Sequence, residues 1–88
     1  MKIEKPVEIF CEETNFALVR VPSRKYPGVL IQGDSLLDLI GTTKEALELL
    51  DEEKIEEAKG ALTYLHDELS WRLERYREVL KEHNTPFF

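Results

Sequence analysis

Apolar and polar residues alternate at the start of the chain. Val7, Ile9 and Cys11 fall on one face of an extended segment, whereas Glu8 and Glu12 fall largely on the other face. A two-residue period of this kind is typical of a strand with one buried face. We therefore expect a first strand here, with its apolar face against the core.

Two further apolar runs follow within the first third of the chain. Residues 16–21 form a β-rich run in which Ala17, Val19 and Val21 share one face, and residues 29–32 form a second run. The segment between them is rich in proline and glycine, which is typical of a loop. Because these connections are too short for parallel crossovers, we expect an antiparallel three-stranded meander over residues 7–32.

The pattern then becomes helical. Asp34 or Ser35 can cap the start of a helix, since either side chain can accept hydrogen bonds from the free amides of a first turn. Gly41 is expected to end this stretch, and a capping box that begins at Thr42 is expected to restart it. We therefore predict a short helical region over residues 34–50, with a kink near Gly41.

Residues 53–83 have the three- and four-residue spacing of one long helix. The apolar positions are Ile55, Ala58, Leu62, Leu65, Leu69, Tyr76 and Val79, and Arg72 interrupts the series. Such a helix extends roughly 45 Å, which is longer than a sheet of short strands can cover. Part of it is therefore expected to need another partner. Asn84 suits a C-cap, and residues 84–88 form an aromatic tail.

The predicted fold is α+β and forms a single domain over residues 1–88. The antiparallel meander packs on a kinked short helix and one long C-terminal helix. A chain of 88 residues buries only about 60 to 65 % of the surface that its unfolded form exposes, so its core is thin.

Charge and composition exclude several classes of function. Eighteen acidic and twelve basic residues give a net charge of -6, which disfavours nucleic-acid binding. No apolar run is long enough to span a membrane, and the first residues lack the apolar core of a signal peptide, so we expect a cytoplasmic location. Cys11 is the one cysteine in the sequence and the carboxylates lack paired histidines, so we predict no metal and no cofactor.

The residues Gly33-Asp34-Ser35-Leu36 resemble the strand-to-helix junction of the GDSL family of serine hydrolases. That resemblance implies a nucleophilic serine, oxyanion donors from separate Gly and Asn blocks, and a distant Asp-x-x-His pair. None of those further blocks is present, and the available bases are His66 and His83. We therefore predict a protein that is not an enzyme and keep a small esterase that uses Ser35 as an alternative.

A cationic segment lies between Thr14 and Gly33, which contains three basic residues and no acid. Because guanidinium groups bind carboxylates and phosphates bidentately, the segment can bind an acidic protein or an anionic ligand. The alternative is a solvated turn whose cations pair with acidic helices. The candidate binding residues of this strand-loop-helix junction are Arg20, Arg24, Lys25, Tyr26, Gln32, Asp34 and Ser35.

The C-terminal half of the long helix has a wide apolar face. Trp71 lies off the main seam, where a large aromatic side chain suits an interface better than water. We therefore predict a homodimer through this helix, with interface residues Leu69, Trp71, Leu73, Tyr76 and Leu80. The acidic residues between Glu48 and Glu57 provide a negative surface for a basic protein, or a helix face kept soluble by charge.

Several blocks of the chain together resemble a family of small bacterial proteins of unknown function. These blocks are Arg20-Val21-Pro22, Arg24, Tyr26-Pro27-Gly28, Gln32-Gly33-Asp34-Ser35-Leu36 and residues 76–88. The resemblance implies bacterial origin and a free-standing domain, and it implies no activity. The leading hypothesis is a non-enzymatic, dimeric interaction protein with a protein partner, for example a toxin-neutralising or regulatory protein. The second alternative is a regulator that binds an anionic ligand through Arg20 and Arg24.

Overall fold

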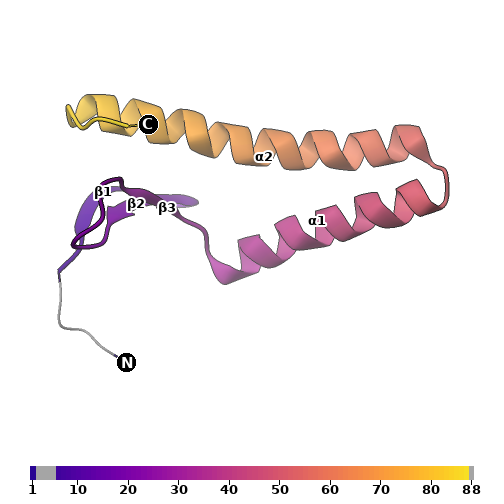
Figure 1. Ribbon diagram of the computed structural model, residues 1–88, viewed down its shortest axis with the longest axis horizontal. Coiled ribbons are helices and arrows are strands. Elements are labelled where there is room, and N and C mark those ends of the chain that lie inside the picture. The colour runs from indigo at the N-terminus through magenta and orange to yellow at the C-terminus, as the bar shows by residue number, and fades with distance from the viewer. Residues whose placement is uncertain (2–5, 88) are drawn as a thin grey trace. The chain divides into compact units, whose positions relative to one another are not determined.

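The computed structural model of the chain describes residue 1 and residues 6–87, and it has the predicted α+β fold (Figure 1). The elements in chain order are β1 (Glu8–Glu13), β2 (Phe16–Arg20), β3 (Gly28–Leu30), α1 (Gly33–Asp51) and α2 (Ile55–Glu82). They form two compact units, which we call the sheet unit (the described part of residues 1–31 and 72–88) and the hairpin unit (residues 32–71). The helix α2 contributes its N-terminal part to the hairpin unit and its C-terminal part to the sheet unit.

The three strands form an antiparallel sheet in the order β1-β2-β3, as the short connections predicted. The strand β3 ends at Leu30, two residues earlier than the predicted end at Gln32. In the register of the sheet, Ile9 lies opposite Val19, and Ala17 lies opposite Leu30. These four residues therefore share one face of the sheet.

A β-bulge in β1 changes which side chains share a face. The partner of Ile9 is Val19 and the partner of Cys11 is Leu18, so Phe10 is the extra residue. Because adjacent residues of β2 point to opposite faces, Ile9 and Cys11 also lie on opposite faces. The prediction that they share one face was therefore wrong, since a strict two-residue period does not allow for an inserted residue.

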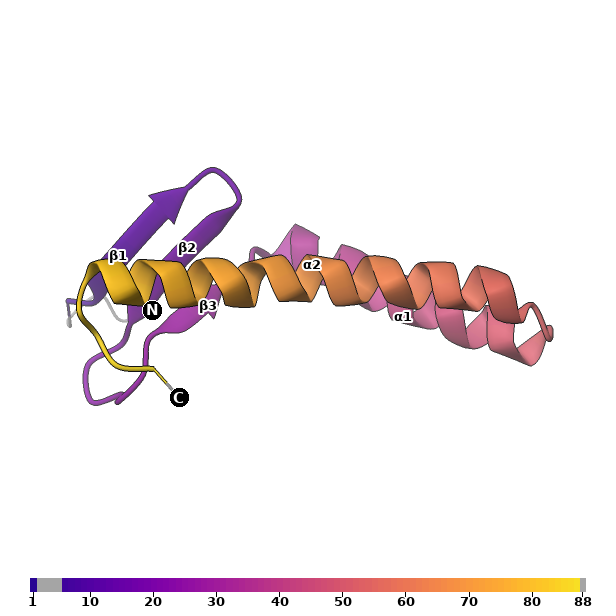
Figure 2. The same ribbon diagram turned by 90° about the horizontal axis from the view of Figure 1, so that it is seen from above.

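The C-terminal part of α2 lies across one face of the sheet (Figures 1 and 2). Phe16 and Leu18 are buried on this face of β2, as the alternation along the strand requires. The buried side chains of α2 in this unit are Tyr76, Val79 and Leu80. Together these residues form the core of the sheet unit.

Polar contacts attach the same part of α2 to β1. The guanidinium group of Arg75 forms an ion pair with Glu13 at 2.6 Å, and Nε2 of His83 lies 3.1 Å from the main-chain carbonyl of Phe10. The ring of Phe10 also contacts the His83 ring edge-to-face, with 5.3 Å between centroids. His83 therefore has a structural role at the end of α2.

The helix α2 ends in a Schellman motif at Asn84. The amide of Asn84 donates to the carbonyl of Lys81 and the amide of Thr85 donates to that of Leu80, while Asn84 has a φ of 52°. The predicted C-cap region is thus confirmed, and asparagine suits it because it tolerates left-handed backbone angles. Of the predicted aromatic tail, Phe87 is half-buried and Phe88 lies outside the described residues.

In the hairpin unit, α1 and the N-terminal part of α2 run antiparallel side by side (Figure 1). The helix α1 is uninterrupted from Gly33 to Asp51, so the predicted break at Gly41 does not occur. The hydroxyl group of Thr42 donates a hydrogen bond to the carbonyl of Asp38, one turn earlier in the same helix. Thr42 therefore lies inside α1 and does not cap a new helix. A single glycine costs a helix only about 1 kcal/mol, which the flanking apolar residues offset.

The start of α1 also differs from the prediction. Its N-cap is Gln32, whose carbonyl accepts from the amide of Leu36 and whose side chain makes no capping hydrogen bond. Asp34 lies in the first turn, where its carboxylate accepts from the amide of Ser35 at 2.9 Å. Asp34 thus accepts from a free amide, and its negative charge interacts favourably with the helix dipole. It does so from within the first turn, so neither Asp34 nor Ser35 is the N-cap.

A tight turn connects α1 and α2 through a second Schellman motif. The amide of Glu53 donates to the carbonyl of Leu50, and the amide of Lys54 donates to that of Leu49. Glu53 has a φ of 62°, in the left-handed region that favours glycine. The turn therefore contains a residue that strains the backbone.

The hairpin unit has a very small core. Of residues 32–71, all of which the structure describes, only Leu39, Ala46 and Ala58 are buried.

Neither α1 nor α2, the two helices of the described chain, is long and apolar enough to cross a membrane.

Candidate functional site

The sheet has an apolar face that α2 does not cover, which we call the outer sheet face. Its apolar residues are Ile9, Ala17, Val19, Val21 and Leu30, and Glu12, which lies opposite Ala17, is exposed at its β1 edge. Ile9, Val21 and Leu30 are each more than half exposed, whereas Ala17 and Val19 are half-buried between them. An antiparallel sheet with one solvated face normally has polar residues there. The outer sheet face therefore has the composition of a contact surface.

The edge of this face at β3 is hollowed and basic. A shallow depression of about 270 Å³ is lined by Val19, Val21, Arg24, Tyr26, Gly28, Val29 and Leu30. Lys25 lies over the ring of Tyr26, with 5.3 Å from its Nζ to the ring centroid. Arg24 and Lys25 are exposed, and they lie in the loop between β2 and β3 that the prolines and the glycine predicted.

The loop conformation that presents Arg24 has a local cause. The amide of Arg24 donates to the carbonyl of Val21 at 3.1 Å, and Ser23 between them has a φ of 76°. Proline at the second position and a positive φ at the third position are features of a type II turn. The turn begins directly after β2 and therefore places Arg24 beside the outer sheet face.

Arg20, the first residue of the predicted cationic site, is already bound within the sheet unit. Its Nε and second terminal nitrogen donate to the two carboxylate oxygens of Glu8 at 3.0 and 2.7 Å. Its other terminal nitrogen lies 3.4 Å from the carbonyl of Lys25, and the guanidinium group lies over the ring of Phe10. The hydrogen bond from Arg20 holds the pKa of Glu8 below its usual value. Arg20 therefore connects β1 to the loop, and its fork is not open to an external anion.

The predicted junction from Arg20 to Ser35 is divided between the two units. Arg20, Arg24, Lys25 and Tyr26 belong to the sheet unit, whereas Gln32, Asp34 and Ser35 belong to the hairpin unit. The first group forms the basic edge described above. The second group forms the first turn of α1.

The structure shows the surroundings of both candidate bases for Ser35. Nδ1 of His66 lies 3.4 Å from Asp67, and its Nε2 lies 3.4 Å from the hydroxyl of Ser70. Nε2 of His83 lies against the carbonyl of Phe10. The hydrogen bonds of both histidines within the described residues therefore lead to groups other than Ser35.

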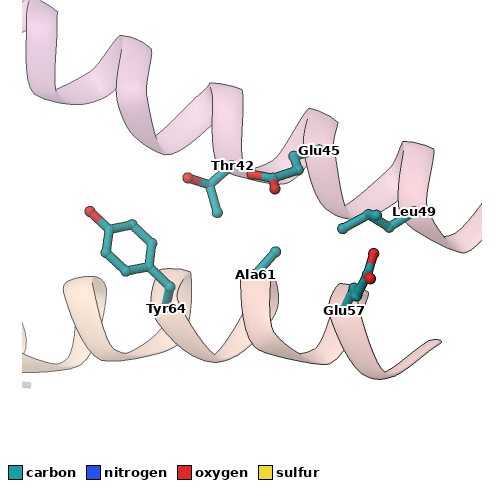
Figure 3. Close-up of a pocket in the computed structure, with 6 residues that line it drawn as sticks. All are labelled: Thr42, Glu45, Leu49, Glu57, Ala61 and Tyr64. Carbon is teal, nitrogen blue, oxygen red and sulfur yellow. The ribbon is translucent and has the colours of Figure 1, made fainter. Parts of the chain in front are cut away.

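A second hollow lies between the two helices of the hairpin unit, and no pattern in the sequence predicted it. Thr42, Glu45 and Leu49 of α1 face Glu57, Ala61 and Tyr64 of α2 around about 380 Å³ (Figure 3). These residues provide two carboxylates and two hydroxyl groups. Among the described residues, no group of three or more His, Cys, Asp or Glu side chains could hold a metal ion.

Two of the five predicted interface residues are not on the surface. Tyr76 and Leu80 are buried in the core of the sheet unit, so they cannot contact a second chain. Trp71 is half-buried and donates from Nε1 to Glu68 at 3.2 Å. Leu69 and Leu73 remain exposed. The spacing of apolar residues did not distinguish contact with the sheet from contact with another chain.

Cys11 lies on the face of β1 that carries Glu13, and its thiol donates to the carboxylate of Glu13 at 3.1 Å. Desolvation, followed by the hydrogen bond and charge of Glu13, raises the pKa of Cys11. A raised pKa reduces the thiolate fraction at neutral pH, which is the reactive form. These surroundings are those of an unreactive thiol.

Comparison with known proteins identifies a family for the chain but no function for the outer sheet face. No curated protein and no solved structure matches the chain. The match that was found covers residues 1–87 and is to the model of a family of unknown function, DUF6959. The chain therefore belongs to the DUF6959 family of unknown function.

Proposed function

We propose that the protein is a non-enzymatic interaction protein that binds another protein through the outer sheet face. The observation that carries this proposal is the apolar composition of a sheet face that α2 leaves open. Ile9, Val21 and Leu30 provide the exposed apolar area, and water contact with such area is unfavourable. A protein partner removes that area from water.

The basic edge determines the chemistry of the partner. Arg24 and Lys25 lie beside the depression, so a complementary surface has apolar side chains flanked by carboxylates. Tyr26 adds an aromatic ring at the same edge, and tyrosine is enriched among residues that dominate binding energy. A toxin that this protein neutralises and a protein that it regulates each fit this description, and peptide sequencing of the captured partner distinguishes them.

Site-specific photo-crosslinking in the protein's own cells tests the proposal. A photoreactive amino acid replaces Val21, which is 52 % exposed on the outer sheet face. The matched control carries it at Glu74, an exposed residue of α2 in the same unit. We expect an adduct of one defined mass at position 21 and none at position 74.

Two further results decide the outcome. The double substitution Val21→Asp and Leu30→Asp should abolish the adduct formed from a third site such as Ile9, while the circular dichroism spectrum stays unchanged. No adduct at position 21, or equal adducts at positions 21 and 74, would count against the outer sheet face. An adduct with the mass of two copies of this chain would show that the outer sheet face binds a second copy and not a different protein.

A further inference from the structure

The hairpin unit has an uncovered apolar surface of its own, distinct from the outer sheet face. We call it the hairpin stripe. It consists of Leu36, Ile40, Leu47 and Leu50 of α1 together with Ile55, Leu62 and Leu69 of α2. Each of these side chains is between 42 and 64 % exposed. The α2 members repeat every seven residues, and those of α1 follow three-, four- and seven-residue steps, which is the period of helix bundles.

The two halves of the stripe lie on the same side of the hairpin. Successive residues of a helix are rotated by about 100° around the helix axis. On α1, the stripe residues are therefore rotated by roughly 120° from Thr42 and Leu49, which face α2. The α2 stripe lies roughly 120° beyond Glu57 and Ala61 in the same sense of rotation. Because the helices are antiparallel, equal rotations in the same sense bring both stripes to one side.

The opposite side of the hairpin is mainly polar. The same geometry places Asp34 and Glu48 of α1 and Glu56 and Asp67 of α2 there, all exposed, with Leu37 on the same side as Glu48. The hairpin therefore has one continuous apolar side, one mainly polar side and a small core between its helices.

The small core requires a further layer. The forty residues 32–71 bury only Leu39, Ala46 and Ala58. Helices depend on tertiary packing of their apolar faces, and units of about 40 residues usually need oligomerisation or another staple. A second layer on the hairpin stripe provides that packing.

We propose that a second copy of this chain covers the hairpin stripe, so that two hairpins form an antiparallel four-helix bundle. Thr43 at the middle of the α1 stripe and Leu62 at the middle of the α2 stripe are similarly distant from the connecting turn. A two-fold axis at this level pairs Leu36 with the second copy's Leu50 and Leu62 with its own counterpart. The stripe is therefore complementary to itself, as a two-fold interface requires.

The size of the stripe also suits a dimer. Seven half-exposed Leu and Ile side chains leave roughly 600 Å² of apolar surface open, and the polar rim brings the total close to the about 800 Å² per partner that specific interfaces bury. In the antiparallel arrangement the acidic turns, which contain Asp51, Glu52 and Glu53, lie at opposite ends of the bundle. Repulsion between the turns is thereby reduced.

Size-exclusion chromatography with light scattering tests the assembly on the full chain. We expect a mass of about twice 10.3 kDa for the parent protein and the single-copy mass for Leu47→Glu. Glutamate retains high helix propensity, so the substitution removes apolar contact without breaking α1. Leu37→Glu is the matched control, because Leu37 is 69 % exposed on α1 outside the stripe and its replacement should leave the dimer intact.

Cross-linking tests the two-fold geometry without disrupting the core. In a Cys11→Ser background, Leu62→Cys should form covalent dimers with a short bismaleimide, whereas Leu37→Cys should not. Leu36→Cys alone should give little product, and Leu36→Cys combined with Leu50→Cys should give much more. A monomeric parent protein, a dimeric Leu47→Glu variant or no cross-link at position 62 would each overturn the proposal. Because the outer sheet face takes no part, Val21→Asp should leave the mass unchanged, which separates a failure here from a failure of the proposed function.

Discussion

The hydroxyl group of Tyr76 donates a hydrogen bond to the main-chain carbonyl of Pro27 across 3.2 Å, although the residues are 49 positions apart. Pro27 is buried just before β3, and Tyr76 is buried on α2. The bond therefore anchors the end of the loop that carries Arg24 and Lys25. It gives the basic edge of the outer sheet face a defined position relative to the core of the sheet unit.

Replacement of Tyr76 by Phe should lower the free energy of unfolding by about 1 to 2 kcal/mol, because the carbonyl of Pro27 loses its hydroxyl donor while the ring stays packed. Urea denaturation measures this change. The slope of the unfolding free energy against urea concentration should stay the same. Tyr64→Phe is the control, since Tyr64 is exposed and should show a change near zero. Equal effects of the two substitutions would show that the bond to Pro27 contributes nothing.

Tyr76 also predicts a loss of stability at alkaline pH. Burial raises the pKa of Tyr76 above its usual value of 10.0. The unfolded chain therefore ionises first, so the contribution is fully present below pH 10 and is lost as the pH rises through the folded pKa. Thermal melts across this range should show a smaller alkaline decrease for Tyr76→Phe than for the parent protein. An identical decrease would assign the effect to other groups.

The lowered pKa of Glu13 predicts a loss of stability at acidic pH. Hydrogen bonds from Cys11 and Arg75 lower the pKa of Glu13 from its usual value of 4.5. Its contribution is therefore present above the unfolded pKa and is lost as the pH falls through the lower folded pKa. Melting temperatures of Glu13→Gln should depend less on pH below 5 than those of the parent protein, where about 5 marks the onset of carboxylate protonation. Glu12→Gln, on the other face of β1, is the control.

Glu53→Gly should stabilise the protein by about 0.5 to 1 kcal/mol, because glycine adopts left-handed backbone angles without a steric penalty. Glu53 has a φ of 62° in the turn between α1 and α2. Denaturant unfolding at neutral pH measures the difference. Glu53→Gln removes the same charge and keeps the strained side chain, so it should change stability much less. A larger gain for the Gln variant would indicate charge repulsion in the acidic turn as the cause.

A fluorophosphonate probe should not label Ser35. The histidines that a nucleophilic serine would need are hydrogen-bonded to Asp67, Ser70 and the carbonyl of Phe10. Intact mass spectrometry after incubation with the probe detects any adduct. Labelling that disappears in Ser35→Ala would revive the esterase alternative.

Much of the secondary structure followed from local patterns. The helices Gly33–Asp51 and Ile55–Glu82 lie within two residues of the predicted segments 34–50 and 53–83. The helical end at Asn84 was also readable from the sequence. These features depend on contacts within a few residues of each other, which the spacing of apolar and capping residues records directly.

The candidate surfaces were less predictable. Arg24, Lys25 and Tyr26 are exposed in a loop that the prolines and the glycine predicted, but no local pattern indicated that Glu8 of β1 binds Arg20 of β2. The bulge at Phe10 was likewise invisible, and it decides that Ile9 belongs to the outer sheet face. An apolar pattern shows that a face avoids water, yet it does not show which surface covers that face.

The sequence by itself therefore determined the strands, the helices, their order and the antiparallel connections of this protein. Only the tertiary structure decided that Tyr76 and Leu80 fill the core of the sheet unit, that Arg20 pairs with Glu8, and that the sheet and the hairpin each retain an open apolar face. The physical reason is the range of the interactions. Backbone hydrogen bonds within helices and turns join near neighbours, whereas burial and ion pairing join residues that only the folded chain brings together.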